Sequence, residues 1–266
     1  MKKIKIYDNN FSHAKYMTDF QECNFFEWTR GDDQSEEIVF VSDNFLTEAD
    51  NIHGKKYAIL IEPPSISPDI YKQIKNVSKK FEKVLTYDKS LIDTGENYTF
   101  YPHGGCWIAP EDQKIYKKTK NISIISSDKD VTEGHKLRHE IISKAKNIDV
   151  YGRIYNPVKY KKEALQDYRF SIVIENCKKD YYFTEKLIDC FVTGTIPIYW
   201  GCPSIGKFFD TDGMIIVENY EEILNFLGHA GKKLYNSKIK GLKNNFKTAK
   251  EYIIAEDWIY KNIIQK

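Results

Sequence analysis

Polar side chains in the segment 170–203 lie at the ends of two apolar strands, where they could bind a ligand. The first strand, residues 170–174, ends at an acid and an amide, Glu175 and Asn176, and the second spans residues 195–200. In open α/β sheets, ligands bind outside the carboxyl ends of the strands. The segment therefore predicts a binding site at one edge of a sheet.

The residues between these two strands predict the start of a helix that suits phosphate or sugar. Tyr182 precedes Thr184, which occupies the position of an N-cap, and Glu185 and Lys186 follow in the first turn. A helix N-terminus presents unpaired N–H groups and a partial positive charge. Glu185 could accept two hydrogen bonds from a sugar diol, and Lys186 could balance a diphosphate. The alternative is an ordinary capped surface helix, whose dipole also favours an acid at this end.

A guanidinium is expected near the same edge. Arg138 lies on a predicted helix after the strand 121–126, and the chain contains only three other arginines, Arg30, Arg153 and Arg169, among many lysines. The planar fork of an arginine suits phosphate better than the point charge of a lysine. Arg138 is therefore a candidate phosphate ligand, and an exposed helix arginine is the alternative.

Two further positions could contribute to chemistry. Glu62 follows the strand 57–61 and precedes two prolines that stiffen the backbone, so its carboxylate is a candidate general base. An ordinary loop acid is the alternative. After His103, the glycines Gly104 and Gly105 would let a ligand approach the backbone closely. These three residues are candidate acceptor or loop contacts, and a tight structural turn is equally consistent with them.

No metal site is expected. His135 and His139 are four residues apart, but Lys136 stands where the HExxH motif needs a glutamate. The triplet Asp210–Thr211–Asp212 could hold a divalent metal on a diphosphate. Turn chemistry explains both of its aspartates without one.

Composition indicates a globular protein. The 266 residues carry a formal net charge of +2, which argues against a dedicated nucleic-acid binder. No apolar run approaches the roughly 18–20 residues that span a bilayer, and the N-terminus MKKIKIYDNNF has no apolar signal core. The five cysteines include no CxxC pair, which is typical of free thiols in a reducing cytosol. A cytoplasmic location is expected, with peripheral membrane contact of the lysine-rich region 232–250 as an alternative.

The order of elements predicts an α/β protein with two Rossmann-like halves that face a central cleft. Strands are expected at residues 4–7, 37–42, 57–61, 83–86, 121–126, 149–151, 170–174, 195–200 and 214–217. Helices are expected at residues 67–80, 90–94, 132–146, 160–166, 184–193 and 220–227, and across most of 232–266. The polar, lysine-rich segment 111–120 is the expected crossing between the halves.

The sequence FSIVIENCKKDYYFTEKLIDCFVTGTIPIYWGCP resembles the signature of the α-1,3/4-fucosyltransferases, glycosyltransferase family 10. That signature runs from an aromatic-rich strand through F-E-N, a short loop, Y-[VIF]-T-E-K and a helix to G-T-[IV]-P-[IV]-x-x-G-x-P. The resemblance covers roughly residues 120–220, and IENC stands where F-E-N-[ST] is more usual. It implies the GT-B fold, with an acceptor domain at 1–115, a nucleotide-sugar domain at 116–245 and a tail at 246–266 that packs back across the cleft.

The resemblance also implies roles for particular residues. Glu185 would bind the guanosine ribose hydroxyls or the fucose, and Lys186 the diphosphate. Arg138 resembles the family's arginine that pairs with the pyrophosphate, and Glu62 resembles its proposed catalytic base. Asn176 and Tyr182 also fall on donor-site positions.

The activity implied is inverting transfer of L-fucose from GDP-β-L-fucose to a hydroxyl of a glycan acceptor, with an α-1,3 linkage to GlcNAc or a related sugar expected. No cofactor is expected, and no essential divalent metal, because protein cations can neutralise the departing diphosphate. The alternatives are transfer from another GDP- or 6-deoxy-sugar and a non-catalytic module that binds a nucleotide or glycan.

Overall fold

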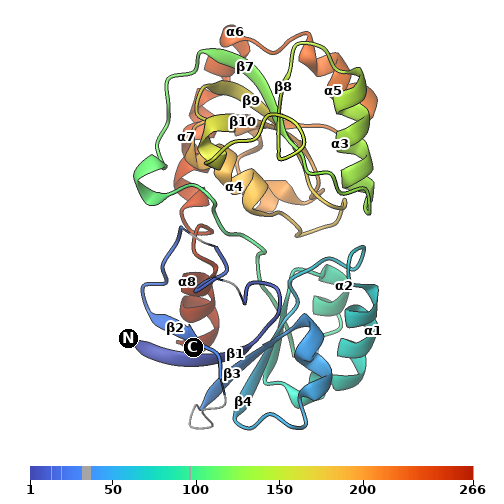
Figure 1. Cartoon of the computed structure of the whole chain (residues 1–266), viewed down its shortest axis with the longest axis vertical. Coiled ribbons are helices and arrows are strands. Elements are labelled where there is room, and N and C mark those ends of the chain that lie inside the picture. The colour runs from blue at the N-terminus through green and yellow to red at the C-terminus, as the bar shows by residue number, and fades with distance from the viewer. Residues whose placement is uncertain (13, 19, 32–36, 96, 266) are drawn as a thin grey trace. The chain divides into compact units, whose positions relative to one another are not determined.

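The computed structural model describes residues 1–12, 14–18, 20–31, 37–95 and 97–265. The chain forms two compact units, the first made of Met1–His103 with Ile254–Lys266 and the second of Gly104–Ile253 (Figure 1). These boundaries differ from the predicted positions near 115 and 245. The polar segment 111–120 belongs to the second unit, where Ile115 lies against Gly194.

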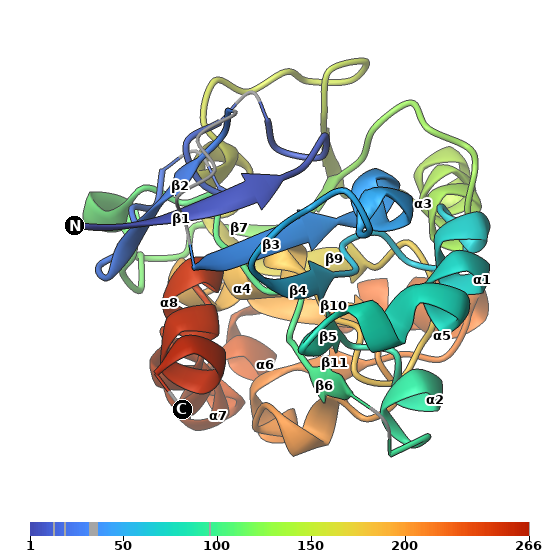
Figure 2. The same ribbon diagram turned by 90° about the horizontal axis from the view of Figure 1, so that it is seen from below.

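The first unit contains a parallel sheet in the strand order β2-β1-β3-β4-β5-β6, seen from another side in Figure 2. Its strands are β1 (Lys2–Tyr7), β2 (Phe26–Thr29), β3 (Ile38–Ser42), β4 (Lys55–Ile59), β5 (Lys83–Thr86) and β6 (Tyr98–Phe100). The strand β2 is not among those expected from the sequence, because it is short and carries an acid. Its alternate residues Phe26 and Trp28 are nonetheless buried, as a half-buried strand requires.

Alternate side chains of this sheet contact two separate apolar layers. Val39 and Val41 of β3 pack with Ile74 of α1 (Pro68–Val77), whereas Phe40 between them packs with Ile259 of α8 (Ala255–Ile259). Successive strand residues point to opposite faces, so both faces of the sheet are apolar and both are covered.

The C-terminal segment is tied to the first unit by two acids that follow Ile254. Glu256 Oε1 accepts hydrogen bonds from the Met17 backbone N–H at 2.7 Å and from Trp28 Nε1 at 2.9 Å. Asp257 accepts both the backbone N–H and the side-chain amide of Asn24. These buried contacts explain why the tail belongs to the first unit, although it follows the second in sequence.

The second unit contains a parallel sheet in the order β11-β10-β9-β7-β8. Its strands are β7 (Lys120–Ile125), β8 (Asp149–Tyr151), β9 (Tyr168–Ile174), β10 (Ile196–Trp200) and β11 (Ile215–Ile216). The chain moves from β7 outward to β8 and from β9 in the opposite direction to β10. The strand order therefore reverses between β7 and β9, which is the topological switch point where such sheets bind ligands.

Helices flank this second sheet, with α3 and α5 on one side of the strands and α4 and α7 on the other (Figure 1). The helices of the second unit are α3 (Glu133–Lys144), α4 (Glu185–Val192), α5 (Tyr220–Leu227), α6 (Lys232–Ser237) and α7 (Ile239–Ala249). The first unit also contains the short α2 (Lys89–Ile92) and a π-helical turn at Tyr260–Ile264. The helix expected at 160–166 is instead a 3₁₀ turn, Lys161–Ala164. Ser67 precedes α1 without capping it through its side chain, whereas Thr184 caps α4 as expected.

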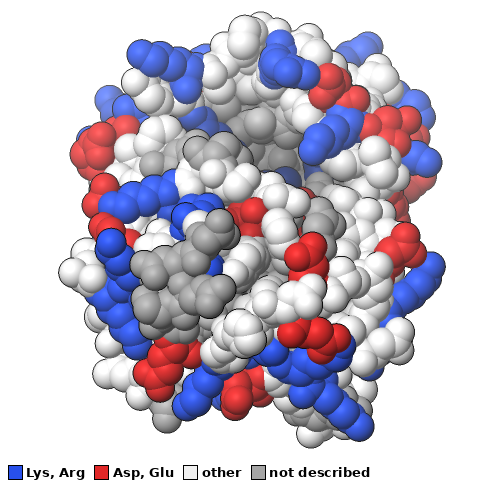
Figure 3. Space-filling model, turned by 60° about the horizontal axis from the view of Figure 1, so that its bottom comes forward, with Lys and Arg blue, Asp and Glu red and all other residues white. Residues whose placement is uncertain are grey.

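The described residues contain no helix long and apolar enough to cross a membrane. Basic and acidic side chains are interspersed over the face drawn in Figure 3, as the small net charge leads one to expect.

Candidate functional site

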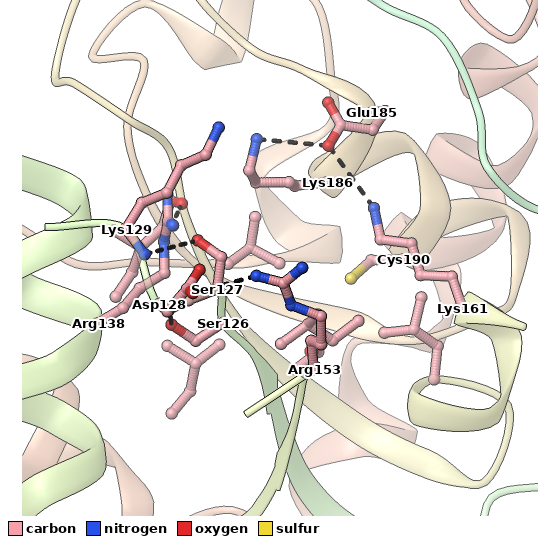
Figure 4. A pocket seen from close by; sticks show the side chains of 17 residues that line it. Ser126, Ser127, Asp128, Lys129, Arg138, Arg153, Lys161, Glu185, Lys186 and Cys190 are labelled. Carbon is pink, nitrogen blue, oxygen red and sulfur yellow. Dashed lines mark hydrogen bonds and ion pairs between the residues drawn. The ribbon is translucent and has the colours of Figure 1, made fainter. Parts of the chain in front are cut away.

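A cavity of about 530 Å³ lies at the carboxyl edge of the second unit's sheet. Its walls include residues 125–129 at the end of β7 and beyond it, residues 171–174 of β9 and the first turn of α4, so it lies at the switch point (Figure 4). Among the described lining residues, basic side chains outnumber acids, with Lys129, Arg138, Arg153, Lys161 and Lys186 against Asp128 and Glu185. A pocket with excess positive charge attracts an anionic ligand.

Arg138 is the most buried of these cations, with 5% of the residue exposed. Its Nε donates to the Ile174 carbonyl at 3.1 Å, and its Nη2 donates to Asn176 Oδ1 at 2.8 Å. These bonds fix the guanidinium at the end of β9. Arg138 thus lines the cavity from α3, and Asn176 contributes to the site by orienting Arg138.

Gly134 lets the start of α3 approach the end of β9. Its backbone N–H donates to the Asn176 carbonyl at 3.1 Å, and a Cβ at this position would lie 1.7 Å from the Glu175 carbonyl oxygen. Real Cβ contacts are never this short, so a larger residue would push α3 away from β9. The spacing between Arg138 and the strand end therefore depends on this glycine.

Glu175 connects the end of β9 to the start of α4. Its fully buried carboxylate accepts the Thr184 backbone N–H at 2.9 Å and the Thr184 hydroxyl at 2.7 Å, and Lys186 Nζ lies 3.6 Å away. Burial raises the pKa of Glu175. Tyr182, a predicted donor residue, is 1% exposed and does not line the cavity.

Glu185 and Lys186 extend from the first turn of α4 to the cavity wall. Glu185 Oε1 lies 3.4 Å from Lys186 Nζ and 3.6 Å from Lys161 Nζ. Lys161 also forms a 2.6 Å ion pair with the buried Asp189. The opposing effects of burial and of the two acids leave the pKa of Lys161 raised, so this lysine is cationic at neutral pH.

The opposite wall is formed by loops that contain none of the site residues expected from the sequence. Arg153 Nη2 lies 3.2 Å from Asp128 Oδ2, and Lys129 follows that acid. Gly152 has a φ of 140° and approaches the Ser126 carbonyl so closely that a Cβ would lie 1.9 Å from it. The scarcity of arginine was a signal for Arg153, but nothing in the sequence distinguished Lys161 from the other lysines.

Gly104 and Gly105 approach another part of their own chain. The Gly105 N–H donates to the Tyr252 carbonyl at 2.7 Å, and a Cβ on Gly104 would lie 2.7 Å from the same oxygen. These glycines therefore allow two backbone segments to meet in the second unit. His103, the last residue before the crossing, has its ring 6.2 Å from that of Tyr87.

Glu62 belongs to the first unit and follows β4 at the carboxyl edge of that sheet. Its backbone N–H donates to Asp43 Oδ2 at 3.4 Å, and its carbonyl accepts a hydrogen bond from the Tyr71 hydroxyl at 3.1 Å. Both backbone groups of Glu62 are thus hydrogen-bonded, which fixes the point from which its side chain extends.

The possible metal ligands have structural partners. His135 Nδ1 lies 2.9 Å from the Thr132 hydroxyl, and His139 contacts the Tyr155 hydroxyl. Asp210 Oδ1 accepts the Asp212 backbone N–H at 2.9 Å, as turn chemistry requires. The described residues form no cluster of three or more His, Cys, Asp or Glu side chains that could hold a metal ion.

The fold matches solved glycosyltransferases. A crystal structure of an α1,3-fucosyltransferase with GDP matches all of this chain and 90% of its own, with a TM-score of 0.61 at 16% identity. A structure described as an α1,3-fucosyltransferase with GDP-fucose matches 92% of this chain and 82% of its own, with a TM-score of 0.56 at 16% identity. At such identity the likeness shows the fold alone, and the predicted GT-B class of two parallel α/β units is confirmed.

The sequence itself shows the family. The sequence model of a protein family, glycosyltransferase family 10 (fucosyltransferase), C-terminal part, matches residues 115–253, which is more than half of the chain. This chain belongs to glycosyltransferase family 10.

Curated relatives match over shorter regions. The α-(1,3)-fucosyltransferase FucT of Helicobacter pylori is 40% identical over 86 residues, 30% of this chain and 18% of that protein. The α-(1,3)-fucosyltransferase B of Drosophila melanogaster is 33% identical over 111 residues, 39% of this chain and 24% of that protein. In both, the match covers less than a quarter of the relative's length.

Proposed function

We propose that this protein is an inverting fucosyltransferase that moves L-fucose from GDP-β-L-fucose to a glycan hydroxyl, with α-1,3 linkage to GlcNAc or a related sugar expected. Family membership supports fucosyl transfer, and the relatives and neighbours named above are α1,3-fucosyltransferases. The observation that carries the proposal is the cationic cavity at the switch point of the second sheet. A GDP-sugar has the two negative phosphates and the hydroxyl groups that such a cavity suits.

In this proposal the diphosphate binds beside Arg138 and Lys186. The Arg138 guanidinium is oriented by two hydrogen bonds, and Lys186 lies at the positive end of α4. Both charges are fixed before the ligand arrives, so little reorganisation is needed when the diphosphate leaves. Glu185, on the same wall, would accept hydrogen bonds from donor hydroxyls.

The reaction would be a single in-line displacement. The acceptor oxygen forms a bond to the anomeric carbon as the bond from that carbon to the β-phosphate oxygen breaks, and the bonding electrons leave with GDP. Glu62 would take the proton of the acceptor hydroxyl. General-base assistance contributes about 10²–10⁴-fold to the rate.

We also propose that no divalent metal is essential. The cavity supplies basic side chains around the expected diphosphate position, and such cations can stabilise the charge on a leaving group. Activity would then persist in excess EDTA, and an activity restored only by added Mg²⁺ or Mn²⁺ would contradict this part.

The decisive experiment is incubation with GDP-fucose and a glycan array, followed by mass and linkage analysis. An added 6-deoxyhexose in α linkage is expected. Competition with GDP-mannose and UDP-sugars separates the alternative donors. Binding of GDP without turnover on the full array would instead support a non-catalytic module and reject the proposal.

A further inference from the structure

Charges alternate along one wall of the cavity. Lys161 Nζ lies 2.6 Å from Asp189 Oδ2 and 3.6 Å from Glu185 Oε1, and Lys186 Nζ lies 3.4 Å from the same Glu185 oxygen. Figure 4 shows interactions from both lysines converging on Glu185. Lys186 belongs to α4 itself, whereas Lys161 reaches Glu185 from a separate 3₁₀ turn.

We propose that Lys161 is a positioning residue of the donor site. It holds the Glu185 carboxylate in one orientation, so that Glu185 can accept hydrogen bonds from hydroxyl groups of the nucleotide sugar. This inference rests on the proposed function, because it requires a ligand with vicinal hydroxyls in the cavity.

The surroundings of Lys161 suit this role. Its side chain is 22% exposed, and that of its partner Asp189 is fully buried. Asp189 is itself fixed, since its Oδ1 accepts the Trp107 backbone N–H at 2.8 Å. A partly buried ion pair is screened less by salt than a surface pair, so Asp189 holds the Lys161 ammonium in place beside Glu185.

The next residue provides a matched control. Lys162 belongs to the same 3₁₀ turn and forms a 2.6 Å ion pair with Asp112, and neither residue lines the cavity. Lys162→Met therefore removes one charge and one ion pair from the same turn while it leaves Glu185 untouched.

Lys161→Met alone would leave the charge of Asp189 buried without its partner, which is strongly destabilising. The comparison is therefore made in the Asp189→Asn background. Asparagine keeps a side-chain oxygen for the Trp107 N–H but carries no charge. In this background Lys161 still has Glu185 as a partner, and the added Lys161→Met change tests that contact.

The measurement is calorimetric titration of four proteins with GDP, 2′-deoxy-GDP and GDP-fucose. The proteins are wild type, D189N, K161M/D189N and K162M. We expect K161M/D189N to bind the ligand whose hydroxyl groups contact Glu185, either GDP or GDP-fucose, about tenfold more weakly than D189N does. Loss of a charge-assisted hydrogen bond produces an effect of this size. K162M and wild type should bind alike.

The two ligand comparisons identify which hydroxyls Glu185 contacts. If K161M/D189N loses the preference for GDP over 2′-deoxy-GDP that D189N shows, Glu185 contacts the ribose hydroxyls. If it loses the preference for GDP-fucose over GDP, Glu185 contacts the fucose hydroxyls. The KM for GDP-fucose should rise, with kcat at saturating donor changed less than about twofold, as expected for a ground-state binding contact.

Equal affinities of D189N and K161M/D189N would overturn the inference and leave the proposed function intact. The same loss in K162M would also overturn it, since the effect would then belong to the turn as a whole. A wild-type protein that binds none of the three nucleotides would overturn both the inference and the proposed function. Equal melting temperatures of D189N and K161M/D189N verify that binding, not folding, is compared.

Discussion

Asp43 accepts a hydrogen bond from the backbone N–H of Glu62, the candidate base, with its Oδ2 3.4 Å from that nitrogen. Its Oδ1 accepts the neighbouring Ile61 N–H at 3.0 Å, and Asn10 donates to Oδ2 at 2.7 Å. Asp43 is buried and has a φ of 29°, which is unfavourable for a residue with a side chain. Strained residues of this kind persist where the surrounding structure fixes them, often at active sites.

Glu62→Gln should lower kcat by about 10²–10⁴-fold, because glutamine has nearly the same shape but cannot take a proton. The dissociation constant for GDP should stay within twofold of wild type, since the cationic cavity belongs to the other unit. Steady-state kinetics and calorimetry measure the two quantities. A variant with wild-type kcat would remove Glu62 from the role of base.

Asp43→Asn should lower kcat by about tenfold while GDP affinity is kept, because one of the two acceptor oxygens that hold residues 61 and 62 is lost. Asparagine tolerates the left-handed backbone, so the change is confined to the hydrogen bonds. Asp50→Asn is the control, since Asp50 forms an exposed ion pair with Lys80 in the same unit. Unchanged kcat in D43N would show that Asp43 does not position Glu62.

Arg138→Lys should weaken GDP binding by at least about tenfold, because lysine lacks the planar fork that reaches Ile174, Asn176 and a phosphate together. Arg169→Lys is the matched control. Arg169 also bonds to backbone carbonyls, those of Lys118 and Lys120 among them, but it does not line the cavity. R169K should lower the melting temperature and keep GDP affinity, and an R138K variant with wild-type affinity would exclude Arg138 from the site.

Protonation of His135 should make the folded protein less stable in mild acid. The Nδ1 of His135 accepts a hydrogen bond from the Thr132 backbone N–H and lies 2.9 Å from the Thr132 hydroxyl, so the cap of α3 requires a neutral ring. Burial and the nearby Arg138 lower the pKa of His135 from 6.5 to about 4. The unfolded chain therefore binds the extra proton first, and the stability present above pH 6.5 is lost as the pH falls toward about 4. The full loss is on the order of 3 kcal/mol.

Urea unfolding between pH 4 and 7 measures this effect. His135→Gln should flatten the slope in that window, because glutamine does not titrate and suits the third position of a capping box. Equal slopes for wild type and H135Q would contradict the assignment.

Local patterns predicted much of the fold and part of the candidate site. Apolar runs bounded by polar residues identified β5, β9 and β10 with small boundary errors, because burial on both faces requires continuous apolar side chains in a parallel strand. The order Thr184, Glu185, Lys186 identified the start of α4, since capping depends on residues two or three positions apart. The family resemblance extended this to the donor region, and the family itself is confirmed.

Tertiary structure decided the features that join distant segments. Lys161 lies beside Glu185 only because a 3₁₀ turn packs against α4, and Asp43 lies beside Glu62 only because β3 and β4 are neighbours in the sheet. Nothing in the composition separates Lys161 from Lys162, yet one lines the cavity and the other does not. The sequence by itself located many of the strands and helices, with β2 and the 3₁₀ turn Lys161–Ala164 as exceptions, because local patterns depend on neighbours along the chain. Which side chains share a site depended on packing, because these contacts form between segments that meet only when the sheets assemble.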